Sequence, residues 1–385
     1  MVEHSDATPV YLDYAAATPL ADKVARAMQP YMSDVFYNPS ALYGGARTAK
    51  AALEDARSLA ARSIGARPSE IIFTAGGTES ANLAIRGVME RFPDGELIIS
   101  SIEHDAVRKP AHKYGALQCS VNAKGRVDPG SIRAQITEST VLISVMYANN
   151  EIGTVQPIKE IVDIARAVRS ERAKAGNAMP LYVHTDACQA PLYLNVDVSR
   201  LGVDLMTLNG GKIYGPKQSG ILYKKVGVEL APQIMGGGQE FGMRSGTESV
   251  AQAVGCAKAL ELAIAQRANV VRHTSELSAY FIAQLEERYN AVINGDRKHR
   301  LSNNIHATFQ GADNERMLFS LDQQGVWAAT GSACSASSEE SSHVMHAIGK
   351  SDEDARSSIR FSIGRETTQA EIHRTLNAID TALRA

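Results

Sequence analysis

Short apolar runs alternate with helical stretches between about residues 48 and 225. These runs are almost continuously apolar: EIIFT, ELIISS, VLISVMY, LYVHTD, VDLMTL and GILYKK. Between several of them the periodicity is helical, as in residues 48–65, where Leu53, Ala56 and Ile64 share one stripe that Gly65 closes. Buried strands that alternate with helices predict an open, mostly parallel sheet with helices on both faces.

The pattern changes after about residue 260. Long amphipathic helices are predicted at SELSAYFIAQLEERY and QAEIHRTLNAIDTAL. Between them, SSIRFSIG alternates Ile359, Phe361 and Ile363 with polar residues, which predicts a half-buried strand. We therefore expect an α/β protein with a large domain at 15–260 and a smaller α+β domain made of 1–14 and 261–385.

Composition narrows the class of protein. The 385 residues are 44% hydrophobic, enough for a large core, and the formal net charge of −2 gives no general attraction to nucleic acids or anionic membranes. The four cysteines are too far apart for a CxxC pair, so we expect free thiols of a reducing compartment and no metal site. Neither a signal peptide nor a membrane span is visible in the pattern. A cytoplasmic location is expected.

The unusual polar residues follow the predicted strands. EIIFT runs into AGGTES, where Gly77 and Thr78 begin a helix whose N–H groups could hold a phosphate. LYVHTD ends in Asp186 with Gln189 just beyond, and VDLMTL runs into NGGKIYGPK, which contains Lys212. Taken singly, the glycines could form turns, Asp186 could cap a helix, and Lys212 could be a surface lysine. Ligands of open α/β sheets bind beyond the carboxyl ends of the strands, where these residues are expected to meet.

A phosphate cradle, a carboxylate and a lysine suit one cofactor in particular. Pyridoxal 5'-phosphate needs a lysine amine to attach its aldehyde and an anion site for its phosphate. It also needs a carboxylate that keeps the pyridine nitrogen protonated, so that the ring withdraws electrons. The set predicts a pyridoxal-phosphate enzyme.

At this level of detail the chain resembles the cysteine desulfurases of the NifS/IscS type, class-V aminotransferases that depend on pyridoxal phosphate. The shared motifs follow the family's order over nearly the whole chain: YLDYAAATP, FTAGGTESANLAI, EHDAV, NNEIG, HTDACQA, KIYGPK, GGGQEFGMRSGT, GSACSAS and SSIRFSIGR. The resemblance implies fold type I, the aspartate aminotransferase-like fold, and a homodimer that converts L-cysteine to L-alanine. It further implies that the sulfur passes to an acceptor protein, for iron–sulfur clusters or thio-modified tRNA, without direct binding of nucleic acid.

The resemblance also assigns roles to the cofactor-binding residues. Lys212 matches the lysine that holds the cofactor covalently, Asp186 the partner of the ring nitrogen, and Gln189 the donor to the phenolic oxygen. His104 matches a histidine that stacks on the ring and transfers protons. The remaining implied cofactor-binding residues are Gly77, Thr78, Asn150, Asn209, Gly211 and, from the neighbouring subunit, Thr247.

The resemblance also implies which residues bind the substrate and which residue receives the sulfur. Asn150 and Arg360 match the groups that hold the substrate carboxylate, for which a bidentate guanidinium is well suited. Cys334 lies in GSACSASSEESS, a run with little apolar surface to bury, and matches the nucleophile that receives the sulfur. The other three cysteines are expected in or near the core.

Two departures from the family pattern leave alternatives open. The usual Ser-Gly-His-Lys is Asn209-Gly210-Gly211-Lys212 here, so two side chains that normally bind phosphate are changed. Housekeeping members also continue beyond the equivalent of the last helix, so the resemblance does not identify the sulfur acceptor. The alternatives are a selenocysteine lyase, another pyridoxal-phosphate lyase or aminotransferase, and a weakened member that acts as a sulfur-transfer scaffold. An aminotransferase would have no use for Cys334.

Overall fold

A seven-stranded sheet forms the centre of the larger part of the molecule. The computed structural model describes residues 8–331 and 341–384. The strands lie in the order β2 (Ile71–Thr74), β8 (Gly220–Lys224), β7 (Leu205–Asn209), β6 (Tyr182–Asp186), β5 (Thr140–Ser144), β3 (Glu96–Ser100) and β4 (Leu117–Cys119). Only β8 runs antiparallel to its neighbours, β2 and β7. The predicted parallel sheet is therefore confirmed, with β4 as an addition.

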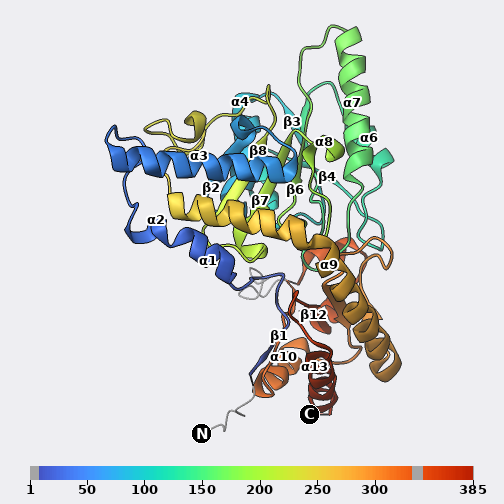
Figure 1. The fold of residues 1–385 in the computed structure, drawn as a ribbon. Helices are drawn as coiled ribbons and strands as arrows, with labels where there is room; N and C mark the ends of the chain where they lie inside the picture. Colours follow the sequence, from blue (N-terminus) through green and yellow to red (C-terminus); the bar gives the residue numbers. More distant parts are fainter. Residues whose placement is uncertain (1–7, 332–340, 385) are drawn as a thin grey trace.

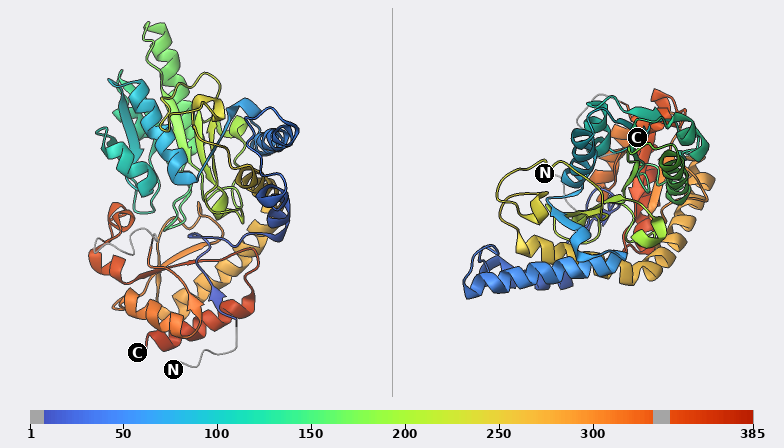
Figure 2. Two further views of the ribbon diagram at one scale, coloured as in Figure 1. Left: turned by 90° about the vertical axis from the view of Figure 1, so that its left-hand side faces the viewer. Right: turned by 90° about the horizontal axis from the view of Figure 1, so that it is seen from above.

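Helices cover both faces of this sheet, as Figure 2 shows. They are α1 (Asp22–Met28), α2 (Pro30–Ser33), α3 (Gly44–Ile64), α4 (Gly77–Arg91), α5 (Asp105–His112), α6 (Pro129–Gln135), α7 (Ile158–Lys174), α8 (Val198–Leu201) and α9 (Val250–Tyr289), with the short 3-10 turns η1 (Pro68–Glu70), η2 (Gly210–Lys212) and η3 (Glu240–Gly242). Ile71 packs in one core with α3, α7 and α9, and Ile72 in another with α4. Consecutive strand residues thus face opposite cores, as a doubly covered sheet requires.

A second, smaller unit lies below the first and contains the first described strand of the chain and its last described helix (Figure 1). Its strands are β1 (Val10–Tyr11), β9 (Val292–Ile293), β10 (Asn304–Thr308), β11 (Val326–Trp327) and β12 (Ser358–Ser362), and its helices α10 (Asn314–Gln323), α11 (His343–Ala347), α12 (Asp352–Arg356) and α13 (Gln369–Ala382). β1 pairs in parallel with β11, which ties the N-terminal arm to this unit. It has its own apolar core, which includes Phe281 and Phe361.

The prediction of a half-buried strand at β12 is wrong. Every residue of β12 is buried, the polar ones included, because both faces of the strand are covered. Polar side chains of β12 form hydrogen bonds inside the protein: the hydroxyl of Ser362 accepts from the N–H of Ala15 at 2.9 Å, and Arg360 donates to Asp13. The polar residues that alternate with apolar ones in β12 therefore face other polar groups of the protein and not solvent.

The long helix α9 connects the two cores. It begins against α3 and ends in the smaller unit, so SELSAYFIAQLEERY is its last part and not a separate helix. Because the helix is continuous, the division into 15–260 and 1–14 with 261–385 stays a prediction.

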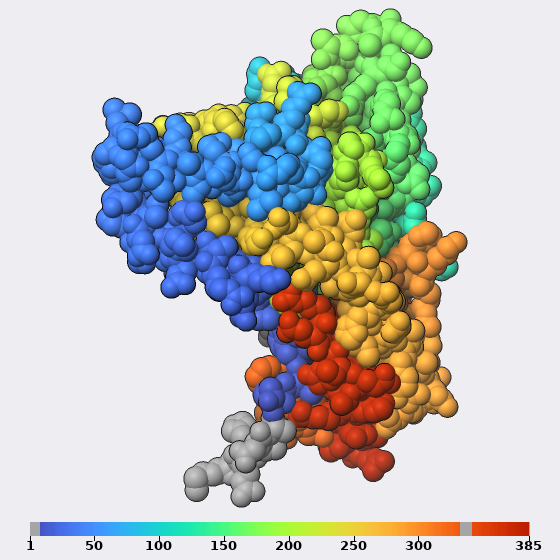
Figure 3. Space-filling model, in the orientation of Figure 1, coloured from blue at the N-terminus to red at the C-terminus, as the bar shows by residue number. Residues whose placement is uncertain are grey.

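None of the helices within 8–331 and 341–384 is both long and apolar enough to cross a bilayer. In Figure 3 the turn between α2 and α3 projects from the body.

Candidate active site

A cavity of about 270 Å³, here called the first cavity, opens beyond the carboxyl ends of the parallel strands. Its lining brings together most of the residues that the sequence singled out: Gly77, Thr78, His104, Asn150, Asp186, Gln189, Asn209, Lys212 and Arg360. They come from five separate strand ends and loops of the large sheet and from β12. Residues that lie up to 283 positions apart, such as Gly77 and Arg360, thus share one cavity.

Lys212 is the last residue of the short turn η2, directly after β7. Its Nζ donates to the carbonyl oxygens of Ala15 at 3.0 Å and Ala16 at 2.5 Å. Burial lowers the pKa of this amine, and the charge of Arg360 lowers it further. A lowered pKa increases the neutral, nucleophilic fraction of the amine, which is the form that attaches to an aldehyde.

Asp186 ends β6 beside this lysine, and its carboxylate is buried. Oδ1 accepts from the N–H of Cys188 at 2.9 Å. Gln189 follows and donates through Nε2 to the carbonyl of Ala15 at 3.0 Å, so the N-terminal arm closes this side of the cavity. Cys188 is half-buried and lines the cavity, and burial together with the charge of Asp186 raises its thiol pKa well above the ordinary value.

His104 lies at the N-terminus of α5, where its Nδ1 accepts from the N–H of Ala106 at 3.1 Å. A neutral ring with an acceptor at Nδ1 carries its proton on Nε2. The preceding residue, Glu103, is fully buried; its carboxyl accepts from the N–H of Met146 at 2.8 Å and from the hydroxyl of Ser100. Burial raises the pKa of Glu103 to about 8, so this carboxyl is largely protonated at neutral pH.

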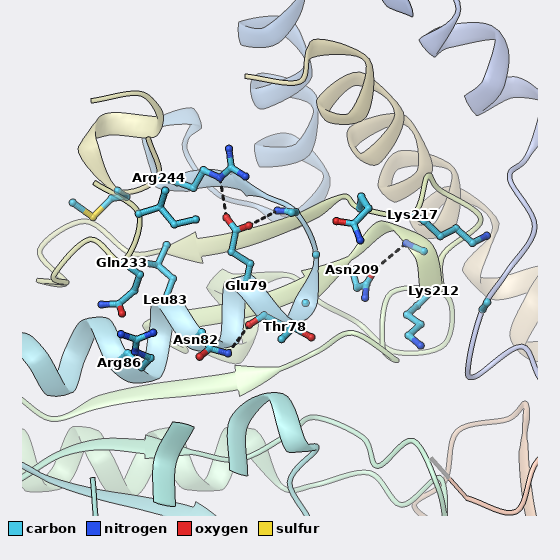
Figure 4. Close-up of a pocket in the computed structure, with 18 of the residues that line it drawn as sticks. Thr78, Glu79, Asn82, Leu83, Arg86, Asn209, Lys212, Lys217, Gln233 and Arg244 are labelled. Atoms are coloured by element: carbon cyan, nitrogen blue, oxygen red, sulfur yellow. Dashed lines mark hydrogen bonds and ion pairs between the residues drawn. The ribbon is translucent and has the colours of Figure 1, made fainter. Parts of the chain in front are cut away.

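A second cavity, of about 630 Å³, shares Gly77, Thr78, Asn209 and Lys212 with the first. Figure 4 shows Thr78, Asn209 and Lys212 around it, where α4 begins. The cap of α4 is Gly76, whose φ of 142° suits glycine, and the first-turn N–H groups of a helix are free to bind an anion. Asn209 Oδ1 accepts from the N–H of Gly211 at 2.9 Å. The amide nitrogen of Asn209 lies at the start of α4, 3.4 Å from the point that a Cβ atom on Gly77 would occupy.

Arg360 is fully buried and borders the first cavity from β12. Its Nη2 donates to Asp13 Oδ1 at 2.6 Å and its Nη1 to the carbonyl of Asn150 at 3.1 Å. Nε is buried without a hydrogen-bond partner among the described residues. A guanidinium held on one side by a carboxylate can still present its charge to a carboxylate that enters the cavity.

Three of the expected site residues are not among the described residues that line the first cavity. Gly211 lines the second cavity only. Thr247 is exposed and lines a third cavity, of about 300 Å³, that does not include Lys212. Cys334 lies outside the described residues. Two residues that follow 332–340 make contacts near the site: Ser342 Oγ donates to Glu151 Oε2 at 2.6 Å, and the ring Nε2 of His343 lies 3.0 Å from the carbonyl oxygen of Glu103.

Sequence reasoning missed three neighbours of the site. Cys188 was expected near the core, but it lines the cavity because it follows Asp186 at the strand end; the motif HTDACQA already places it beside a site residue. Asp13 gave a weaker signal, as an acid within YLDYAAATP, and only the fold brings it to Arg360. Glu103 precedes His104 directly, yet nothing in the sequence shows that it is buried.

The sequence is similar to known proteins over nearly its whole length. The sequence profile of the family "Aminotransferase class-V" matches residues 10–375. Proteins named cysteine desulfurase IscS are 43% identical in Dictyoglomus turgidum, over 96% of this chain and 93% of that protein, and 41% identical in Methanosarcina thermophila, over 96% and 91%.

Solved structures extend the comparison to the fold. A NifS-like protein superposes with a TM-score of 0.89 at 29% identity, over 98% of this chain and all of that one. SspA, solved in complex with cysteine, gives a TM-score of 0.79 at 34% identity, over 93% of this chain and all of the other.

Proposed function

We propose that this chain removes sulfur from L-cysteine with pyridoxal 5'-phosphate and releases L-alanine. The premise is that it belongs to the class-V aminotransferase family and, within that family, to the cysteine desulfurases. The observation that carries the proposal is the first cavity, where Lys212, Asp186, His104 and Arg360 converge. Each supplies a different function that this reaction needs.

The residues present fit the cofactor. Lys212 would hold it through an amine whose pKa is lowered by burial, and Asp186 would pair with the ring nitrogen. The first-turn N–H groups of α4 and the amide of Asn209 would hold its phosphate. When bound, pyridoxal phosphate withdraws electrons from the carbon atoms of the substrate and weakens the bonds beside them.

Arg360 and His104 would act on the substrate itself. The guanidinium of Arg360 would pair with the substrate carboxylate, and Asp13 would keep it oriented toward the cavity. His104 would donate the proton held on Nε2 and take one up again, because its Nδ1 is engaged by the backbone of α5.

Cys334 would be the nucleophile that receives the sulfur. Its thiolate forms an S–S bond with the substrate sulfur while the C–S bond breaks, and a proton replaces sulfur on the departing alanine. The positions of the flanking residues support this assignment: Gly331 lies beside Glu151, and Ser342 donates to the same carboxylate. Glu151 follows Asn150, which lines the first cavity, so the described residues Gly331 and Ser342 lie near the site.

A homodimer would complete the site. Thr247 is exposed on its own protomer, away from Lys212, and would reach the phosphate of the partner subunit. Large apolar side chains are exposed nearby, on the turn between α2 and α3 and on the segment before α9: Phe36, Leu42, Tyr43, Ile234, Met235 and Phe241. Apolar surface of this kind is usually covered by a partner, here a second copy of the chain.

The decisive experiment follows both products after incubation with L-cysteine. Wild type should release alanine and carry one extra sulfur atom, mapped to Cys334 by mass spectrometry. Cys334→Ser should keep the visible absorbance of the bound cofactor but lose alanine release and the adduct. Lys212→Ala should lose the absorbance as well. An adduct on Cys119, Cys188 or Cys256, with turnover intact in Cys334→Ser, would disprove the assignment.

The same assay separates the alternatives. Release of alanine from selenocysteine alone would indicate a selenocysteine lyase, and alanine release that never leaves sulfur on the protein would indicate another lyase. A colourless protein that still accepts sulfur from a partner would indicate a scaffold. We further propose a cytoplasmic location and a protein acceptor for the sulfur, which a pull-down with the sulfur-labelled enzyme would identify.

A further inference from the structure

Gln218 adopts a backbone conformation that is unfavourable for its residue type. Its φ is 57°, in the left-handed region that glycine occupies readily and other side chains rarely do. The surrounding loop is fixed by hydrogen bonds: Ser219 Oγ donates to the carbonyl of Pro216 at 2.6 Å, and the N–H of Gly210 donates to Ser219 at 2.9 Å. Non-glycine residues held in this region cluster at functional sites.

Gln218 lies near the start of α4 and lines the same cavity as Gly76, Gly77 and Thr78. β2 and β8 are antiparallel, and Thr74 pairs with Gly220 at their ends. Gln218 precedes Gly220 by two residues, Gly76 follows Thr74 by two, and both line the second cavity. The backbones are close there, since a Cβ on Gly220 would lie 2.6 Å from the carbonyl carbon of Gly76. Gln218 therefore lies at the loop whose N–H groups would bind the phosphate.

The side chain of Gln218 is free to act on that site. It is exposed, and it makes no hydrogen bond to the protein within the residues that the structure describes. It lines both the second cavity, with Gly77, Thr78 and Lys212, and the third cavity, with Thr247. Gly211, which also lines the second cavity, contributes no side chain of its own.

We propose that the Gln218 side-chain amide is a phosphate donor of the cofactor site, and that it supplies the side-chain contact that Gly211 lacks. An amide N–H that points at a phosphate oxygen is a hydrogen bond to a charged group, the stronger kind. The strained backbone is the cost of placing this side chain at the cap of α4. The inference rests on the proposed function, because the phosphate belongs to pyridoxal phosphate.

The test compares two ligands on the full-length apo-protein. Gln218→Gly should bind pyridoxal 5'-phosphate about ten- to a hundredfold more weakly than wild type, the loss of one hydrogen bond to a charged group. Its affinity for pyridoxal, which lacks the phosphate, should be unchanged. Because glycine relieves the strained φ, the Tm of the apo-protein should rise. Gln218→Ala should lose affinity equally without the rise, since alanine keeps the strain.

The outcomes separate this inference from the proposed function. Wild type that binds neither ligand would refute the proposed function and with it the inference. Wild type that binds pyridoxal phosphate while Gln218→Gly binds it equally well would overturn the inference alone. The same holds if Gln218→Gly weakens dimerisation but leaves the affinity for pyridoxal phosphate unchanged, because Gln218 would then be a subunit contact.

Discussion

The sulfur of Cys188 lies 2.7 Å from the point that a Cβ atom on Gly77 would occupy. Gly77 is the first residue of α4 and Cys188 follows Asp186, so two walls of the first cavity meet at this contact. Real Cβ atoms are not found so close to another heavy atom. Residue 77 therefore lacks a side chain because Cys188 fills the space, as well as because an anion has to approach the backbone.

Gly77→Ala is expected to lower the free energy of unfolding by about 1–3 kcal/mol, the usual cost of overpacking. Cys188→Ala should restore most of that loss in the double variant, because it removes the sulfur that the new methyl group meets. Urea denaturation of wild type, the two single variants and the double variant measures the coupling energy between the two substitutions. Additive effects, with no rescue by Cys188→Ala, would show that the clash is relieved elsewhere in the loop.

Asp13 is expected to matter for substrate binding through Arg360. Its carboxylate accepts from Arg360 Nη2 at 2.6 Å, and Arg360 is almost completely buried. In Asp13→Asn the guanidinium loses its charged partner and its fixed orientation, so KM for cysteine should rise about tenfold while kcat changes less. Steady-state kinetics measures the two constants.

Asp94→Asn is the matched control for this variant, since Asp94 is an exposed acid in a turn. It should leave both constants at their wild-type values. Equal losses of kcat and kcat/KM in Asp13→Asn, with KM unchanged, would contradict a role in orienting Arg360 toward the substrate carboxylate.

The central sheet could be predicted because its strands carry their own signal. β2, β3, β5, β6, β7 and β8 are buried on both faces, so they appear as apolar runs between helices. The position of Lys212, Asp186 and His104 at one edge follows from the rule that parallel strands end together. Roles such as that of Arg360 came from the family resemblance, and the fold then placed this residue at the cavity.

Other features depend on contacts that local sequence does not encode. The polar residues of β12 look exposed in the sequence but are buried. Arg360 and Ser362 form hydrogen bonds there with Asp13 and Ala15 of the N-terminal arm, about 350 residues away. β4 has two exposed residues of three, so it lacks the apolar run that marked the other strands. The strained φ of Gln218 also has no signature in the sequence.

Glu103 is expected to make stability depend on pH. Its pKa is about 8 in the folded protein against 4.5 ordinarily, because the carboxyl is fully buried. The folded state therefore keeps a proton that the unfolded state has lost. The protonated Glu103 carboxyl therefore raises the free energy of unfolding. This stabilisation is fully present below pH 4.5 and declines by about 1.4 kcal/mol per pH unit until pH 8.

Glu103→Gln should remove this decline, since an amide stays neutral at every pH. The difference in unfolding free energy between variant and wild type should grow between pH 5 and 8 and level off above it. Urea denaturation across this range measures it, with the exposed Glu138→Gln as the control. A constant difference between Glu103→Gln and wild type would mean that Glu103 is already ionised at pH 5.

The proposed role of Thr247 across the dimer can be tested with hybrid dimers. Thr247→Val removes the hydroxyl at nearly constant shape, and its homodimer should bind pyridoxal phosphate about ten- to a hundredfold more weakly than wild type. A hybrid pairs this chain with a differently tagged Lys212→Ala chain. In the hybrid, the Thr247→Val chain keeps its own Lys212 and receives the intact Thr247 of the partner.

If Thr247 acts across the interface, the Thr247→Val chain of the hybrid should bind the cofactor as tightly as wild type. Borohydride reduction fixes the cofactor only on chains that retain Lys212, so mass spectrometry at limiting cofactor reports the occupancy of that chain alone. A hybrid of Thr247→Val with tagged wild type is the control and should give the same occupancy on the variant chain. Occupancy as low as in the Thr247→Val homodimer would show that the hydroxyl acts within its own subunit. A monomer by light scattering, with full affinity for the cofactor, would refute the shared site altogether.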